Sequence, residues 1–87
     1  MFKHSEEEIE LLKKQVLINA DIFPAIEADM EALTDKIRQV TRKELSPISL
    51  CKLYGFKETK FKPSLHTLNV LSNFCGYKSW KKFCELT

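Results

Sequence analysis

The second half of the chain constrains the fold most, because it contains two short helical patterns with a marked start and a marked end. Ser46 is an N-cap residue followed by Pro47 at the first helical position, and Gly55 suits the left-handed residue that ends a helix. Ser64 opens a second pattern in the same way, and Gly76 closes it. The first pattern predicts a helix of about nine residues, roughly 13 Å long.

Three further helices are predicted. A capping box at Ser5 and Glu8 opens the first helix, which ends near Asn19, Pro24 lies in the first turn of the second, and Ser79 caps the last. The apolar residues at helical spacing are Ile9, Leu12, Val16 and Leu17; Ile26, Met30, Leu33, Ile37 and Val40; Leu65, Leu68, Leu71 and Phe74; and Trp80, Phe83 and Leu86. These patterns predict an all-α fold, with five helices around one core in a single domain of residues 1–87.

Composition excludes several classes of protein. No apolar run approaches the ~20 residues that span a bilayer, and the acidic N-terminus is unlike a signal peptide, which predicts a cytoplasmic protein. Three cysteines without a close pair indicate small core residues in a reducing compartment, and the two histidines lack zinc-site spacing. Because no glycine-rich phosphate loop or catalytic set is present, we expect no enzyme activity, small-molecule substrate, cofactor or metal ion.

Charge is divided unequally along the chain. Residues 1–33 contain three basic and eight acidic side chains, a balance of −5, whereas residues 34–87 contain eleven basic and four acidic side chains, a balance of +7. The net charge of +2 therefore hides a basic second half. A basic surface is typical of nucleic-acid binding, although lysines on a solvated helix face are also ordinary.

The same basic half resembles a known family. Residues 46–53 (SPISLCKL) resemble the recognition helix of the lambda-repressor-like helix-turn-helix proteins, and residues 63–68 (PSLHTL) resemble the start of their fourth helix. Residues 76–83 (GYKSWKKF) resemble the end of that helix and the short fifth helix, in a variant found in N-terminal modules of larger bacterial proteins. The resemblance implies a helix-turn-helix module of a bacterial transcriptional regulator that binds double-stranded DNA. It leaves open a homodimer or an additional C-terminal domain.

In such a domain the helix over residues 46–54 lies in the major groove. Its leucines face the core, which leaves Pro47, Ile48, Ser49 and Lys52 exposed. Lys52 suits guanine or a phosphate, Ser49 suits several base edges, and Ile48 suits a thymine methyl group. No arginine, asparagine or glutamine lies on this face, so specificity would come from DNA shape, dimerisation or another domain.

The phosphate contacts are expected from lysines on both sides of this helix. The full set of predicted DNA-binding residues is Lys43, Ser46, Pro47, Ile48, Ser49, Lys52, Lys57, Lys60, Lys62 and Ser64. With four to six phosphates neutralised, the logarithm of affinity should fall against the logarithm of salt concentration with a slope of roughly −4 to −5.

An alternative function is a protein-interaction or adaptor module with the same fold. Near the start of the second helix, where family members hold an uncharged side chain that meets a phosphate, the sequence has Glu27, Asp29 and Glu31. These carboxylates repel DNA. An exposed Ile48 is also as suitable for a protein contact as for a base contact.

Overall fold

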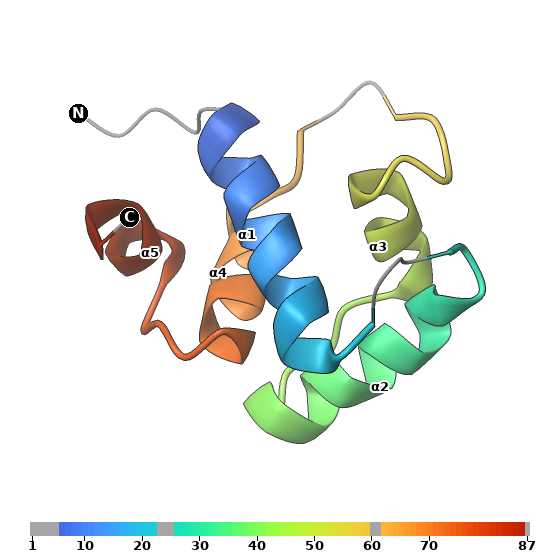
Figure 1. Cartoon of the computed structure of the whole chain (residues 1–87), viewed down its shortest axis with the longest axis horizontal. Coiled ribbons are helices and arrows are strands. Elements are labelled where there is room, and N and C mark those ends of the chain that lie inside the picture. The colour runs from blue at the N-terminus through green and yellow to red at the C-terminus, as the bar shows by residue number, and fades with distance from the viewer. Residues whose placement is uncertain (1–5, 23–25, 60–61, 87) are drawn as a thin grey trace.

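The computed structural model describes residues 6–22, 26–59 and 62–86, and all regular structure in these ranges is helical. The helices are α1 (Glu6–Ala20), α2 (Asp29–Thr41), α3 (Pro47–Leu53), α4 (Leu65–Phe74) and α5 (Trp80–Leu86) (Figure 1). The predicted all-α class with five helices is confirmed. In the described ranges, none of these helices has the length and apolar character needed to cross a membrane.

The predicted caps of α3 and α4 are confirmed. The Ser46 hydroxyl accepts the backbone N–H of Ser49 at 3.0 Å, and the Ser64 hydroxyl accepts that of Thr67 at 3.2 Å. The glycine after each helix has a positive φ, +85° after α3 and +94° after α4, a conformation that side chains with a Cβ rarely adopt. Helix α3 has seven residues because its two caps lie outside helical geometry.

The segment before α2 is only partly described. Ser5, in the predicted capping box, and Pro24 both lie outside the described residues. Helix α2 begins at Asp29, whose carboxylate accepts the backbone N–H of Ile26 at 2.9 Å. At the other end, Arg42 closes α2 in the left-handed conformation, with a φ of +61°.

The predicted core stripe of α2 is confirmed in the middle and wrong at both ends. Met30, Leu33 and Ile37 are buried, whereas Ile26 is 58% exposed and Val40 is 62% exposed. Ile26 precedes the first turn of α2, so helical spacing does not determine its direction. Val40 points outward because the buried face continues through two threonines whose hydroxyls donate to carbonyls four residues earlier.

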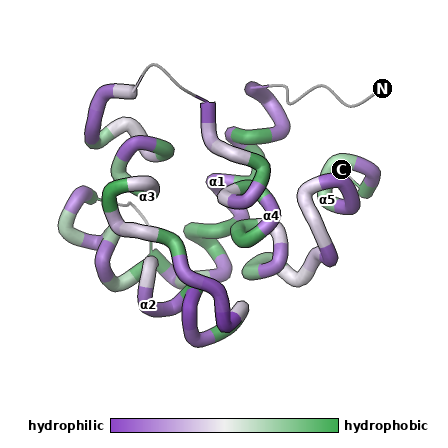
Figure 2. Tube along the Cα trace, turned by 180° about the vertical axis from the view of Figure 1, so that it is seen from behind, coloured by the Kyte–Doolittle hydropathy of each residue, from purple (hydrophilic) through white to green (hydrophobic). Residues whose placement is uncertain are grey.

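The core lies around α4, which packs against α1, α2 and α5. Seen from behind, α1 and α4 lie together in the middle of the molecule, with α3 and α5 on opposite sides (Figure 2). The buried apolar residues are Ile9, Leu12, Val16, Leu17, Ala20, Met30, Leu33, Ile37, Leu45, Leu50, Cys51, Leu68, Val70, Leu71, Phe74, Trp80 and Phe83. Helix α3 packs chiefly against α2 and therefore lies at the edge of the fold.

The buried face of α5, which packs against α4, is aromatic. Phe83 is fully buried, stacked on Trp80 with the ring centroids 5.5 Å apart and edge-on to Tyr77 at 5.0 Å. The predicted inward direction of Trp80 and Phe83 is confirmed. Leu86 is 70% exposed, so its predicted inward direction is wrong, because it lies in the last turn beyond this cluster.

A tyrosine connects the end of α3 to α1. The Tyr54 hydroxyl donates to the backbone carbonyl of Lys13 at 2.9 Å. The Lys13 ammonium lies 5.3 Å from the centroid of the Tyr54 ring and forms an ion pair with Glu10 at 2.8 Å. Burial raises the pKa of Tyr54, so the hydroxyl remains a hydrogen-bond donor at neutral pH.

We expect a Tyr54→Phe variant to lose about 1 kcal/mol of unfolding free energy, because the ring remains while the hydrogen bond to α1 is lost. Urea denaturation followed by circular dichroism measures this change. Tyr77→Phe is the matched control, since within the described ranges the Tyr77 hydroxyl makes no hydrogen bond. Equal losses in the two variants would contradict the proposed connection.

Candidate nucleic-acid interface

Helix α3 presents one face to solvent on the side of the molecule opposite α5 (Figure 1). Ile48 is 54% exposed and Lys52 is also exposed, whereas Leu50 is completely buried. The predicted faces of the helix are confirmed for these three residues. Pro47 and Ser49 are only half-buried, so they contribute less free surface than the sequence predicted.

The two serines of α3 are engaged in capping. The hydroxyls of Ser46 and Ser49 share a hydrogen bond of 2.9 Å, and the Ser46 hydroxyl also accepts the Ser49 backbone N–H. A hydrogen bond from either hydroxyl to a ligand would therefore compete with these capping hydrogen bonds. Ile48 and Lys52 are the residues of this face that are best able to contact a ligand.

A cavity of about 430 Å³ separates α3 from the first half of α1. We call it the α1–α3 groove; its lining residues are Glu6, Ile9, Glu10, Lys13, Ser49, Lys52, Leu53, Thr59, Lys62, Pro63, Ser64 and Thr67. The structure thus brings four of the predicted site residues to one groove: Ser49 and Lys52 from α3, and Lys62 and Ser64 from the segment entering α4.

The loop after α3 begins close to that helix. The backbone N–H groups of Phe56 and Lys57 both donate to the carbonyl of Cys51, at 2.8 and 3.2 Å. This double hydrogen bond holds Lys57, which is exposed, beside the C-terminal end of α3. The predicted phosphate contact by Lys60 falls outside the described residues.

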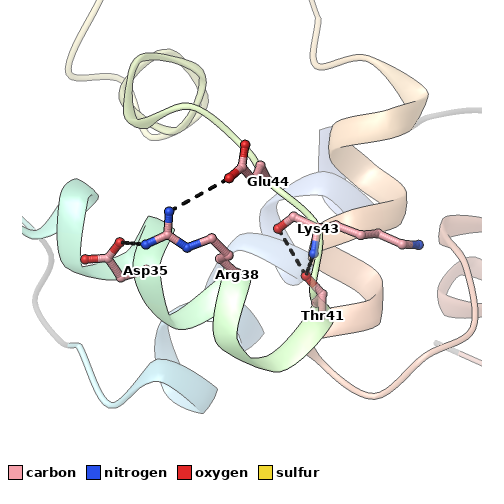
Figure 3. Close-up of polar contacts among 5 residues, drawn as sticks. All are labelled: Asp35, Arg38, Thr41, Lys43 and Glu44. Carbon is pink, nitrogen blue, oxygen red and sulfur yellow. Dashed lines mark hydrogen bonds and ion pairs between the residues drawn. The ribbon is translucent and has the colours of Figure 1, made fainter.

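Lys43 lies apart from the other predicted lysines. Its ammonium donates to the Asn73 side-chain oxygen at 2.8 Å, and in Figure 3 it extends away from Arg38 and Glu44. Asn73 is in the last turn of α4, whereas Ser64 caps the first turn, about 12 Å away along the helix axis. This contact holds Lys43 at the opposite end of α4 from the loop lysines, and its predicted phosphate contact stays a prediction.

Acidic residues border the N-terminal end of α3. A second hollow there is lined by Glu31, Thr34, Asp35, Arg38, Glu44, Leu45, Ser46 and Pro47. Arg38 pairs with Asp35 at 2.7 Å and lies 3.9 Å from Glu44 (Figure 3). Because three carboxylates and one guanidinium group line this hollow, the start of α3 lies in an acidic environment. Of these three carboxylates, sequence analysis identified only Glu31.

Sequence analysis also missed the acidic wall of the α1–α3 groove. Glu6 and Glu10 lie on α1, across the groove from Lys52 and Lys62. No local pattern indicates that the first helix lies opposite the third, so these two carboxylates were not predicted to lie in one groove with Lys52 and Lys62. The one sequence feature that could have indicated this acidic wall is the excess of acidic residues at the start of the first helix.

The three cysteines and His66 are not among the residues that line the α1–α3 groove. Cys51 is buried, and Cys75 and Cys84 are half-buried against the core, with all three thiols free. Burial raises the pKa of the Cys75 thiol to about 11, so it is protonated at neutral pH. His66 is exposed, and in the described residues no group of histidine, cysteine or acidic side chains is suited to hold a metal ion.

Comparison with known proteins supplies no relative from which to transfer a role to these residues. No family model matches the chain, and no curated protein or solved structure is significantly similar to it. The function must therefore be inferred from the exposed face of α3, the lysines beside it and the carboxylates around it.

Proposed function

We propose that the chain is a DNA-binding helix-turn-helix module, of the kind carried by bacterial transcriptional regulators. The observation that supports this proposal most is the position of α3 at the edge of the fold, with Ile48 and Lys52 facing outward. Lys57 and Lys62 follow in the segment that leaves this helix. Helix-turn-helix proteins bind duplex DNA with such an arrangement, in which an exposed short helix enters the major groove and cations beside it contact phosphates.

The contacts divide into two kinds. In the major groove, Lys52 donates to guanine O6 and N7 or to a phosphate, and Ile48 packs on a thymine methyl group. Lys57 and Lys62 neutralise phosphates, and the capped start of α4 at Ser64 follows the same strand. With only two side chains suited to bases, sequence discrimination by this chain alone is modest, and DNA shape or a second copy supplies the remainder.

The acidic residues restrict how α3 approaches DNA. Helix-turn-helix proteins usually contact bases through the N-terminal residues of the recognition helix. Here Glu31, Asp35 and Glu44 border that end and repel phosphates. We therefore place the centre of the contact at Ile48 and Lys52 and along the loop that follows them.

Fluorescence anisotropy with a labelled mixed-sequence duplex tests this function. With Lys52, Lys57 and Lys62 each neutralising one phosphate, the logarithm of affinity should fall with the logarithm of salt concentration with a slope of about −3. This value is smaller than the sequence-based expectation because it counts neither Lys43, which lies at the other end of α4, nor Lys60, which lies outside the described residues. If no complex forms at micromolar protein and low salt, DNA binding is excluded.

The alternative function, docking of a protein partner, is favoured by one specific observation. Carboxylates lie on both sides of α3, and the exposed side chain between them, Ile48, is apolar. A surface of mixed charge around an apolar residue is typical of a protein contact. An Ile48→Ser variant that retains the fold and full DNA affinity would show that Ile48 makes no base contact, which leaves its exposed apolar side chain for a protein partner.

A further inference from the structure

The α1–α3 groove has lysines on one wall, and two glutamates with one lysine, Lys13, on the other. Lys52 and Lys62 lie on the wall formed by α3 and the segment entering α4, and Glu6 and Glu10 lie on the α1 wall. Ile9, Leu53 and Pro63 contribute apolar surface between them. The cations that the proposed function assigns to phosphates therefore share one groove with two carboxylates.

One of the two carboxylates, that of Glu10, is held in position, while Lys52 and Lys62 keep their charge available. Glu10 forms an ion pair with Lys13, whose side chain is only 18% exposed and packs over the Tyr54 ring. Within the described ranges, no ion pair joins Glu6, Lys52 or Lys62 to an opposite charge. The lysines are thus near the carboxylates without being paired to them.

We propose that Glu6 and Glu10 limit the affinity of this site for nucleic acid, as carboxylates that compete with phosphates for Lys52 and Lys62 and repel the backbone of the bound strand. This inference rests on the proposed DNA-binding function. A phosphate that reaches either lysine enters the field of both carboxylates, so part of the favourable interaction with the lysine is cancelled. The two glutamates determine the strength of binding without contacting the duplex.

A single module of this kind is expected to bind DNA weakly. Because carboxylates beside its lysines repel the phosphates that those lysines contact, the complex with one module dissociates readily. Tight binding then requires a second module on the same duplex, because two linked modules bind together with a much higher affinity than either module alone. The two glutamates therefore favour occupancy of sites that two modules contact together.

A charge-matched pair of variants tests this inference. A Glu6→Gln, Glu10→Gln variant should bind the mixed-sequence duplex about tenfold more tightly than the wild type at about 50 mM salt, and the gain should shrink toward about twofold at about 200 mM because salt screens the repulsion. The control is Glu7→Gln, Asp21→Asn, which removes the same charge from exposed residues outside the groove. The affinity of this control variant for the duplex should rise by no more than about twofold.

A single Glu6→Gln variant separates the effect of the carboxylates from release of Lys13, because Glu6 has no ion pair with Lys13. It should show an intermediate gain, and thermal melts confirm that each variant is folded. If the wild type binds and the groove variant binds no more tightly than its control, the inference is wrong while DNA binding stands. If neither the wild type nor the groove variant binds at low salt, the proposed function and the inference both fail.

Discussion

A Lys52→Ala, Lys62→Ala variant is expected to bind duplex DNA about a hundredfold more weakly than the wild type at about 50 mM salt. Each lysine that neutralises one phosphate releases about one counterion, so the loss of two should reduce the salt slope from about −3 to about −1. Lys52 is exposed on α3 and Lys62 is exposed at the entry to α4, and both line the α1–α3 groove. Neither side chain supports the core, so the fold should be retained.

The control for this prediction is Lys14→Ala, Lys78→Ala, which removes the same charge from two exposed positions outside the groove. Lys78 follows the C-terminal end of α4, the end opposite Ser64. Anisotropy titrations at several salt concentrations compare the two variants. Equal losses would mean that affinity follows net charge and that the α3 face has no special role.

Phe83→Ala is expected to lose about 3–5 kcal/mol of unfolding free energy, the largest effect on stability that we predict. Phe83 is completely buried on the helix that packs against α4, so its truncation leaves a cavity in the core beside α5. In a domain of this size, such a loss lowers the melting temperature by roughly 15 °C or more. Differential scanning calorimetry or a thermal melt followed by circular dichroism measures it.

Leu86→Ala, in the same helix, is the matched control because Leu86 is 70% exposed. It should change the unfolding free energy by no more than about 0.5 kcal/mol. A large loss in this variant, or a small one in Phe83→Ala, would contradict the packing of α5 described above.

The parts of the fold that sequence could predict are those with local causes. Ser46 and Ser64 accept backbone N–H groups three residues later, so each cap depends only on residues within one turn. The glycines that end α3 and α4 are equally local signals. Helix type, number and order followed from such signals.

The errors occur where direction depends on a neighbour distant in sequence. Ile26, Val40 and Leu86 continue apolar patterns, yet Ile26 precedes α2, Val40 lies beside a buried face that continues through threonines, and Leu86 lies in the last turn of α5. A helical period predicts which residues share a face, and tertiary packing decides how far along the helix that face is covered.

The candidate site divides in the same way into a part that local signals predicted and a part that depends on residues distant in sequence. Lys52 and Ile48 lie on the exposed face of a helix whose caps fixed its register. Lys43 contacts Asn73, 30 residues further along the chain, and Glu6 and Glu10 face α3 across a groove. Such long-range neighbours leave no local pattern in a single sequence.

The central claim is that α3 and the loop after it form a DNA-binding surface. The most direct test is a ¹H–¹⁵N correlation spectrum of the wild-type chain, recorded as a mixed-sequence duplex is added at low salt. The account predicts that the largest amide shift changes fall on Ile48, Ser49 and Lys52 and on the segment from Lys57 to Ser64. Shift changes confined to the outer face of α1 or to α5, or no changes at all, would contradict it.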